Sequence, residues 1–201
     1  MTALRVALSF LTVLPVGPRT LSSDLGSSRA FFPLVGLLLG GVLVGADALL
    51  APALPPMAVG ALLVAALLAI TRALHVEGFM DVCDGLFGGY TPERRLEIMK
   101  DPHVGSFAVA GAVTLLMLKW ALVTTLAGSA RLPALALFPC LSRWGMLLAT
   151  AAHPYARQEG MGRAFRRGRG VWQVAAGLAT ALVAAAALSG VGGIALWGVA
   201  F

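Results

Sequence analysis

Charge is scarce in this 201-residue chain: charged residues make up 12% of it, and only nine are acidic. Hydrophobic residues account for 59%, and the mean hydropathy is +0.88. These values exclude an ordinary soluble domain, whose charged fraction is about twice as large. Because a helical span needs ~20 apolar residues, the composition predicts an all-α, polytopic membrane protein, with residues 1–201 forming one membrane-embedded domain.

Cysteine is scarcer still, since Cys83 and Cys140 are the only two and lie far apart. No metal-binding or redox spacing is present, so we interpret both as reduced packing residues rather than a disulfide or metal site. No small-residue cleavage site precedes Pro15, which argues against a cleaved signal peptide. The net charge of +6 fits basic membrane loops better than nucleic-acid binding in so apolar a chain.

Apolar runs bounded by Pro, Gly and charged residues predict about five spanning helices. An interfacial helix over residues 3–14, which is too short to span, precedes them. After the fifth span, a Gly-rich break and about eleven apolar residues predict a partial sixth segment that ends at Phe201. The expected spans are 31–51, 57–75, 105–127, 132–152 and 171–189.

Basic residues predict the orientation of these spans. Eleven of the 15 lie in the loops 1–30, 76–104 and 153–170, which alternate with nearly uncharged loops. By the positive-inside rule, these three loops and the N-terminus face the cytoplasm.

Six of the nine acidic residues lie between His75 and Gly105. Glu77, Asp81 and Asp84 follow at i, i+4 and i+7, within roughly 60° of arc on a helix. So much negative charge beside apolar spans favours a hard divalent cation such as Mg²⁺, with Gly85 leaving room for a phosphate. The alternative is a solvated loop with incidental acids.

Other residues near this stretch are candidates with an ordinary structural alternative. His75 projects about 200° away from Glu77 on a continuous helix, which favours a structural or substrate-contacting role over a ligand role. Thr91 and Pro92 predict the start of a short helix. That helix carries Glu97, and near its end Lys100 and Asp101 are candidates for catalysis, unless its charged face is simply solvated.

Two arginines are candidates for binding an anionic substrate. Arg143 lies inside the fourth span, where a cation is costly and usually faces a polar cavity. Arg157 begins a basic loop that could equally be a lipid-headgroup patch, the interpretation we favour for the later arginines of that loop. Lys119 can simply snorkel to the membrane surface.

The chain resembles the cobalamin synthase family, the adenosylcobinamide-GDP ribazoletransferases, over most of its length. The central H-x-[DE]-G-x-x-D-x-x-D-G element, with Glu77 where the family often has Asp, is specific. The matching segments are LSFLTVLPV (Leu8–Val16), FPLVGLLLG (Phe32–Gly40), HVEGFMDVCDG (His75–Gly85), LEIMKDPHVGSF (Leu96–Phe107), Ser142-Arg143 and YARQEGMGRAF (Tyr155–Phe165).

The resemblance implies a Mg²⁺-dependent transferase of the bacterial inner membrane that joins adenosylcobinamide-GDP to α-ribazole or its 5′-phosphate and releases GMP. For this reaction, our hypothesis from the residues is that Glu77, Asp81 and Asp84 are metal ligands, with Asp101 as a further ligand or a base. His75, Glu97 and Lys100 are the other candidates for catalysis, and Gly85, Arg143, Tyr155 and Arg157 are the candidates for substrate binding. A homo-oligomer is left open.

Family members usually continue with a further apolar region and a Gly-rich element, so the resemblance predicts that the family's C-terminal region is missing here. Two other functions remain open from the residues alone. A CDP-alcohol phosphotransferase also uses D-x-x-D-G, but continues with Ala-Arg, which this chain lacks. An ion or metal transporter would place its acids in mid-span rather than at a boundary.

Overall fold

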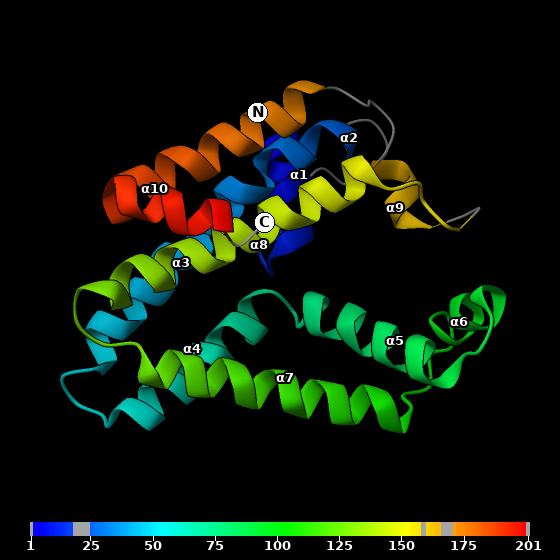
Figure 1. The fold of residues 1–201 in the computed structure, drawn as a ribbon, viewed down its shortest axis with the longest axis horizontal. Helices are drawn as coiled ribbons and strands as arrows, with labels where there is room; N and C mark the ends of the chain where they lie inside the picture. Colours follow the sequence, from blue (N-terminus) through cyan, green and yellow to red (C-terminus); the bar gives the residue numbers. More distant parts are fainter. Residues whose placement is uncertain (1, 18–24, 158–159, 166–170, 200–201) are drawn as a thin grey trace. The chain divides into compact units, whose positions relative to one another are not determined.

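The computed structural model describes residues 2–17, 25–157, 160–165 and 171–199, and over these ranges it contains helices and no strand (Figure 1). The all-α prediction is confirmed. The elements are α1 (Thr2–Leu11), α2 (Leu25–Ser28), η1 (Arg29–Phe31), α3 (Phe32–Leu50), α4 (Pro56–Ile70), α5 (Leu74–Gly88), α6 (Pro92–Ile98), α7 (Ser106–Thr125), η2 (Gly128–Ala130), α8 (Arg131–Ala152), α9 (Met161–Phe165) and α10 (Val171–Val199), where η marks a 3₁₀ turn.

Among the described residues, four helical segments are long and apolar enough to cross a membrane: Leu25–Leu50, Ser106–Thr125, Gly128–Ala152 and Val171–Leu188. The pair α4 and α5 makes a fifth if it counts as one span, although it is bent by 89°. The protein is therefore a polytopic helical membrane protein, as predicted. α1 is a shorter apolar helix of ten residues, and its interfacial position stays a prediction.

Two compact units make up the chain. One comprises Met1–Leu49 and Leu126–Phe201, and the other Leu50–Thr125. We call them the outer-sequence unit and the central unit, and each is described by itself. The prediction of a single domain stays a prediction.

The predicted end of the second span, 57–75, is wrong, because α4 ends at Ile70. The N–H groups of Arg72 and Ala73 donate to the carbonyls of Ala69 and Leu68, at 3.3 and 2.8 Å. This is the Schellman pairing that ends helices. Arg72 and Ala73 both have positive φ, 51° and 53°, where glycine is usual. His75 consequently belongs to α5 rather than to the end of a span.

The C-terminal region agrees with the expected break after the fifth span. The segment long enough to cross a membrane ends at Leu188, close to the predicted residue 189. The helical assignment of α10 continues to Val199, but Figure 1 shows the ribbon turning back on itself within α10. Phe201 lies outside the described residues.

Backbone contact holds α3 against α8 in the outer-sequence unit. A Cβ atom added at Gly36 would collide with the Pro139 carbonyl, and one at Gly40 with the Ala136 carbonyl. Gly36 and Gly40 are one turn apart, so a strip of α3 without side chains lies directly on α8. An ion pair joins the same helices: Arg131 Nε and Nη2 donate to both oxygens of Asp47, at 2.6–3.1 Å.

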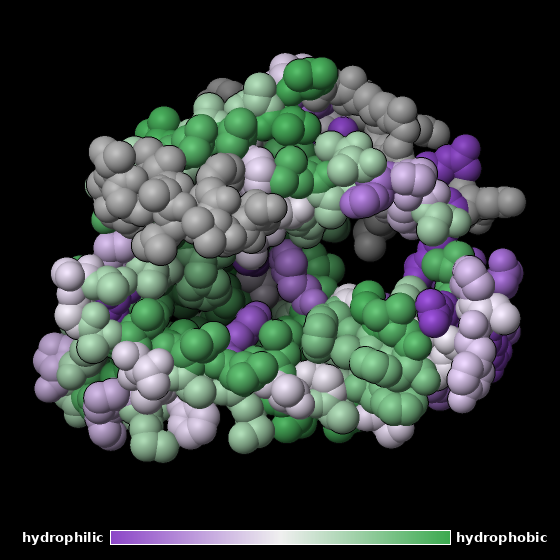
Figure 2. Space-filling view, in the orientation of Figure 1, coloured by the Kyte–Doolittle hydropathy of each residue, from purple (hydrophilic) through white to green (hydrophobic). Residues whose placement is uncertain are grey.

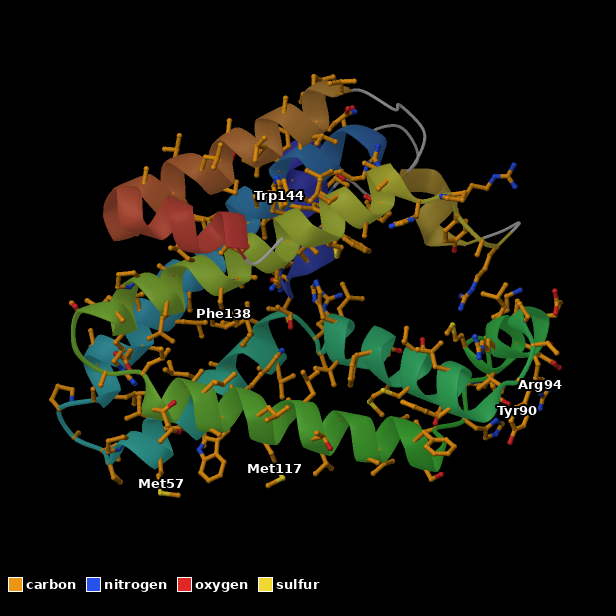
Figure 3. All side chains as sticks on the ribbon, in the orientation of Figure 1. Met57, Tyr90, Arg94, Met117, Phe138 and Trp144 are labelled. Atoms are coloured by element: carbon orange, nitrogen blue, oxygen red, sulfur yellow. The ribbon has the colours of Figure 1, made fainter. Side chains whose placement is uncertain are left out.

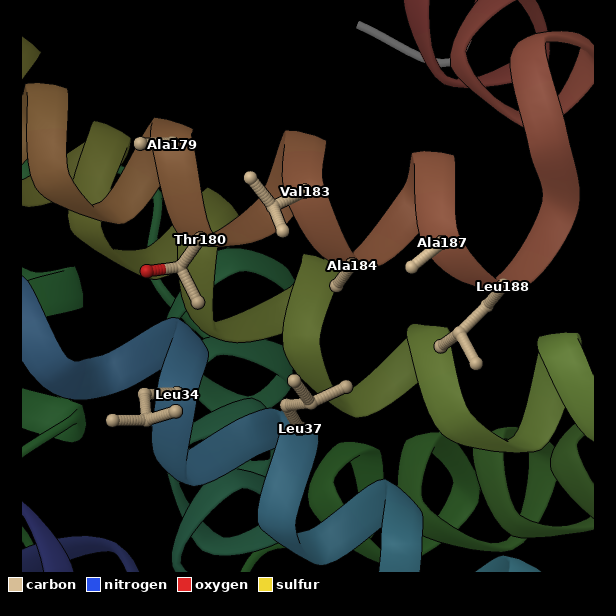
Figure 4. A pocket seen from close by; sticks show the side chains of 8 residues that line it. All are labelled: Leu34, Leu37, Ala179, Thr180, Val183, Ala184, Ala187 and Leu188. Carbon is tan, nitrogen blue, oxygen red and sulfur yellow. The ribbon is translucent and has the colours of Figure 1, made fainter.

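Side chains from α8 and α10 form the apolar core of this unit. Trp144 (labelled in Figure 3) packs with Leu137 and Cys140 against Ala181, Ala184 and Ala185 of α10. Cys140 and Cys83 are free and buried, which confirms the prediction of packing residues. An open apolar groove of about 600 Å³ lies beside this core, between Leu34 and Leu37 of α3 and α10 (Figure 4).

In the central unit, α7 packs along both α4 and α5. The buried hydrophobic side chains of α4, Val59, Leu63 and Leu67, recur at every fourth position and form one face. At the start of α4, Trp120 Nε1 donates to the carbonyl of Met57 at 2.9 Å. Cys83 of α5 meets α7 at Gly111, where an added Cβ would lie 2.5 Å from the sulfur.

The α3–α8 contact makes a first prediction. Gly40→Ala should destabilise the protein by about 1–3 kcal/mol, because the new methyl group must push α8 away. Gly41→Ala is the matched control, since no atom lies within 4 Å of its Cβ position. That control should change stability by about 1 kcal/mol or less, toward stabilisation. Unfolding curves in detergent measure both, and equal midpoints for the two variants would contradict the close contact.

The bend between α4 and α5 leads to a second prediction, in which replacing alanine by glycine has opposite effects on stability at two positions. Ala73→Gly should stabilise the protein by up to about 1 kcal/mol, because glycine adopts positive φ without strain. Ala65→Gly, at an exposed position inside α4, should destabilise it by about 1 kcal/mol. The same unfolding measurement applies, and a loss of stability in Ala73→Gly would contradict the strained bend.

Candidate active site

The acidic stretch forms α5, which carries the three predicted metal ligands at i, i+4 and i+7. Glu77 is exposed, whereas Asp81 and Asp84 are half-buried. The prediction that the three share one helix is confirmed. His75 lies in the first turn of α5 and is half-buried.

Asp84 joins α5 to the start of α7. The backbone N–H of Gly105 donates to Asp84 Oδ2 at 2.7 Å, and that of Ala108 donates to Oδ1 at 2.8 Å. Gly105 directly precedes α7, and Ala108 lies in its first turn. The carboxylate therefore satisfies two N–H groups that have no partner within a helix, and its charge lies at the favourable end of the helix dipole.

The helix α6 folds back onto the end of α5. As predicted, Thr91 caps it, with its Oγ1 accepting the N–H of Arg94 at 3.3 Å, and Pro92 begins it. Arg95 Nε donates to the carbonyl of Gly89 at 2.9 Å. A Cβ on Gly85 would lie 2.6 Å from Met99, so the absence of a side chain at Gly85 lets α6 pack against α5. The predicted role of Gly85 in leaving room for a phosphate stays a prediction.

The catalytic candidates around α6 are exposed. Glu97 pairs with Arg94 at 2.6 Å, an exposed pair of small energetic value. Tyr90 and Arg94 (labelled in Figure 3) lie beside it, and hydrophilic residues gather around α6 in Figure 2. Lys100 lies in the turn that follows α6.

His103 stabilises the ionised form of Asp101 by hydrogen bonds. Its backbone N–H donates to Asp101 Oδ1 at 2.9 Å, and its ring Nδ1 lies 2.6 Å from the same oxygen. The backbone bond, followed by the side-chain bond, holds the pKa of Asp101 below its ordinary value. Asp101 is therefore ionised at neutral pH and is a weaker base than an unperturbed carboxylate.

No group of three or more His, Cys, Asp or Glu side chains among the described residues is arranged to hold a metal ion by itself. The acids of α5 still offer hard oxygen donors one helical turn apart. Mg²⁺ typically takes one or two carboxylates and completes its shell with substrate phosphates and water. The donor chemistry of Glu77 and Asp81 fits that mode, and the metal-ligand assignment stays a prediction.

The outer-sequence unit holds the predicted anion-binding residues. Arg143 is 4% exposed, and its Nη1 donates to Ser142 Oγ at 2.9 Å. Its buried Nε has no hydrogen-bond partner among the described residues. Asp47, the one acidic residue described in this unit, bonds to Arg131 instead. A buried guanidinium in this condition favours an anionic ligand.

The basic loop after α8 folds over a tyrosine ring. Tyr155 and Arg157 are half-buried, and the Tyr155 ring lies against Gly160 and Gly162 at the start of α9. Phe165, at the end of α9, contacts the rings of Phe10 and Phe32 at 4.6 and 5.7 Å between centroids. The later arginines of the loop, Arg166, Arg167 and Arg169, lie outside the described residues.

The apolar grooves do not mark the site of chemistry. The groove in Figure 4 has Thr180 as its one polar side chain, and that hydroxyl bonds to the carbonyl of Ala176. A second groove, of about 400 Å³ between α5 and α7, is lined mainly by Phe79, Phe87, Phe107 and aliphatic residues. The predicted site residues are instead divided between the two units.

Sequence reasoning missed three contacts. The Asp101–His103 turn has a local signal, because Asp side chains often accept the N–H two residues later. The Ser142-Arg143 pair was part of the family resemblance, but the hydrogen bond between the two side chains was not predicted. The bonds from Asp84 to Gly105 and Ala108 cross 21 and 24 residues and carry no local signal.

Comparison with known proteins adds independent evidence. The profile of the cobalamin-5-phosphate synthase family matches residues 3–201. No solved structure matches the chain significantly. Three similar curated proteins are all named adenosylcobinamide-GDP ribazoletransferase.

The protein from Desulfitobacterium hafniense is 45% identical over 82% of this chain and 67% of its own length. The protein from Geotalea daltonii is 42% identical over 94% of this chain and 77% of its own. The one from Desulforamulus reducens is 36% identical over 100% of this chain and 81% of its own. With a family match over nearly its whole length, this chain belongs to the cobalamin-5-phosphate synthase family.

Proposed function

We propose that this protein is an adenosylcobinamide-GDP ribazoletransferase that uses α-ribazole or its 5′-phosphate as acceptor. The observation that carries the proposal is the family match over residues 3–201, together with the names of the relatives. The acidic side chains of α5, in the central unit, and the buried Arg143, in the outer-sequence unit, are the two kinds of group that a diphosphate substrate needs, oxygen donors for a metal ion and a cation.

The proposed reaction is a displacement at phosphorus. The ribose 3′-hydroxyl of α-ribazole forms a new P–O bond to the phosphate attached to cobinamide. The anhydride bond to the second phosphate breaks, GMP leaves, and the hydroxyl proton passes to a base or to water. Such transfers depend on in-line positioning and on neutralisation of charge more than on covalent catalysis.

Glu77 and Asp81 would hold Mg²⁺ together with phosphate oxygens of the substrate. Asp84, the third ligand that the sequence predicts, accepts two backbone N–H groups in the structure. When bound, the ion neutralises charge on the diphosphate. Lys100, Arg143 and Arg157 would bind phosphate oxygens, with Tyr155 and Gly85 as the other candidates for substrate binding. His75, Glu97 and Asp101 are the remaining acid–base candidates, of which Asp101 is already ionised.

A first test asks whether GMP release from adenosylcobinamide-GDP depends on added α-ribazole. Purified protein in lipid vesicles with Mg²⁺ should release GMP and form the joined product in equal amounts, and chelation of the metal should stop both. Omission of α-ribazole is the control. Release of GMP at the same rate without the acceptor would indicate a hydrolase and contradict the proposal.

We also propose that the N-terminus and the loops 76–104 and 153–170 face the cytoplasm of a bacterial inner membrane, because the basic residues concentrate there. In a background that lacks Cys83 and Cys140, Arg163→Cys should resist a membrane-impermeant thiol reagent in intact cells and react after lysis. Leu54→Cys, in the opposite loop, is the matched control and should react in intact cells. The reverse pattern would overturn the orientation.

A further inference from the structure

Asp84 makes contacts that a metal ligand does not require. Its two carboxylate oxygens accept the N–H groups of Gly105 and Ala108, at 2.7 and 2.8 Å. The rings of Phe87 and Phe107 also pack between α5 and the first turn of α7, at 5.6 Å between centroids. Asp84 adds two hydrogen bonds to this contact between the acidic helix and the beginning of the next span.

Gly105 is matched to this carboxylate. A Cβ atom at position 105 would lie 2.6 Å from Asp84 Oδ1 and 2.8 Å from Cγ and Oδ2. Real Cβ atoms do not approach so closely, and the atoms in the way are held by their hydrogen bonds. A side chain at position 105 would therefore displace the carboxylate.

The contact closes a loop that contains the exposed candidates. Residues 85–104, which include α6, Lys100 and Asp101, begin and end at this junction. On one side, Arg95 bonds to the carbonyl of Gly89 and Met99 packs on Gly85, which holds α6 against the end of α5. On the other side, only three residues separate Asp101 from Gly105, so the position of Asp101 depends on where Asp84 holds the start of α7.

We propose that Asp84 is a positioning residue that fixes the start of α7, and through it the Lys100–Asp101 turn, beside the acidic face of α5. The part that concerns catalysis rests on the proposed function, and the part that concerns the junction does not. The two parts need separate measurements.

The junction is tested by amide hydrogen exchange on Asp84→Asn and Gly105→Ala. Asn keeps one acceptor oxygen but turns an NH₂ group toward the second N–H, and Ala displaces the carboxylate. Both variants should lose exchange protection at Gly105 and Ala108 by at least tenfold. Glu93→Gln and Gly88→Ala are the controls: Glu93 is exposed on α6, and a Cβ at Gly88 meets only Ile98, at 3.5 Å. Unchanged protection in both test variants would overturn the junction, whether or not the protein is active.

Kinetic measurements distinguish a positioning role of Asp84 from a role as a metal ligand. A displacement of about 1 Å can cost on the order of 10²-fold in rate, so each variant should lower kcat at saturating Mg²⁺ by tenfold or more. The Mg²⁺ concentration for half-maximal activity should stay within threefold of the parent value. The double variant should be no more than threefold slower than the slower single variant, because both changes break one contact.

If Asp84 instead binds the metal ion, different results are expected for the same variants. If Asp84 acts only as a metal ligand, Asp84→Asn should raise the half-maximal Mg²⁺ concentration more than tenfold and recover at high Mg²⁺. Gly105→Ala should then keep the parent rate. That pair of results would overturn the positioning role, and Gly105→Ala keeps the test decisive if Asp84→Asn fails to fold.

Discussion

Close approach of helix backbones is the constraint on which this structure depends. Within a bilayer, burying an apolar helix against another gains little, because lipid is as apolar as the partner helix. Helices must associate instead through close packing and polar contacts. Gly36 and Gly40 meet this requirement by letting the carbonyls of α8 lie directly on α3. Small residues of α10 do the same against Trp144.

The few charged groups inside the protein follow from the same constraint, because each one must be neutralised where it is buried. Asp47 and Arg131 pair in bidentate geometry across α3 and α8, with 6% and 17% of their side chains exposed. Two backbone N–H groups at a helix start stabilise the carboxylate of Asp84 by hydrogen bonds. Arg143 has a hydroxyl partner and no carboxylate partner among the described residues of its unit, which is why it is a candidate for binding an anion.

Local sequence signals predicted much of this fold. Length and hydropathy located four spans, and Thr91-Pro92 located the start of α6, since these signals act within a few residues. The bend after Ile70 was not predicted, because Thr-Arg-Ala contains neither glycine nor proline to mark it. The bonds between Asp84 and α7 were not predicted either, because two segments more than 20 residues apart create them. For the same reason, the pattern at Glu77, Asp81 and Asp84 predicted a common face but not the different surroundings of its members.

These surroundings bear on the proposed chemistry. Asp101 is bonded to His103 and its pKa is lowered, so it is poorly suited to remove a proton early in a reaction. Phosphoryl transfer through a loose transition state makes no such demand, since the attacking hydroxyl loses its proton late and the charge on phosphate oxygens dominates. The lowered pKa of Asp101 therefore does not count against the proposed reaction, in which the placement of each charge would matter more than its basicity.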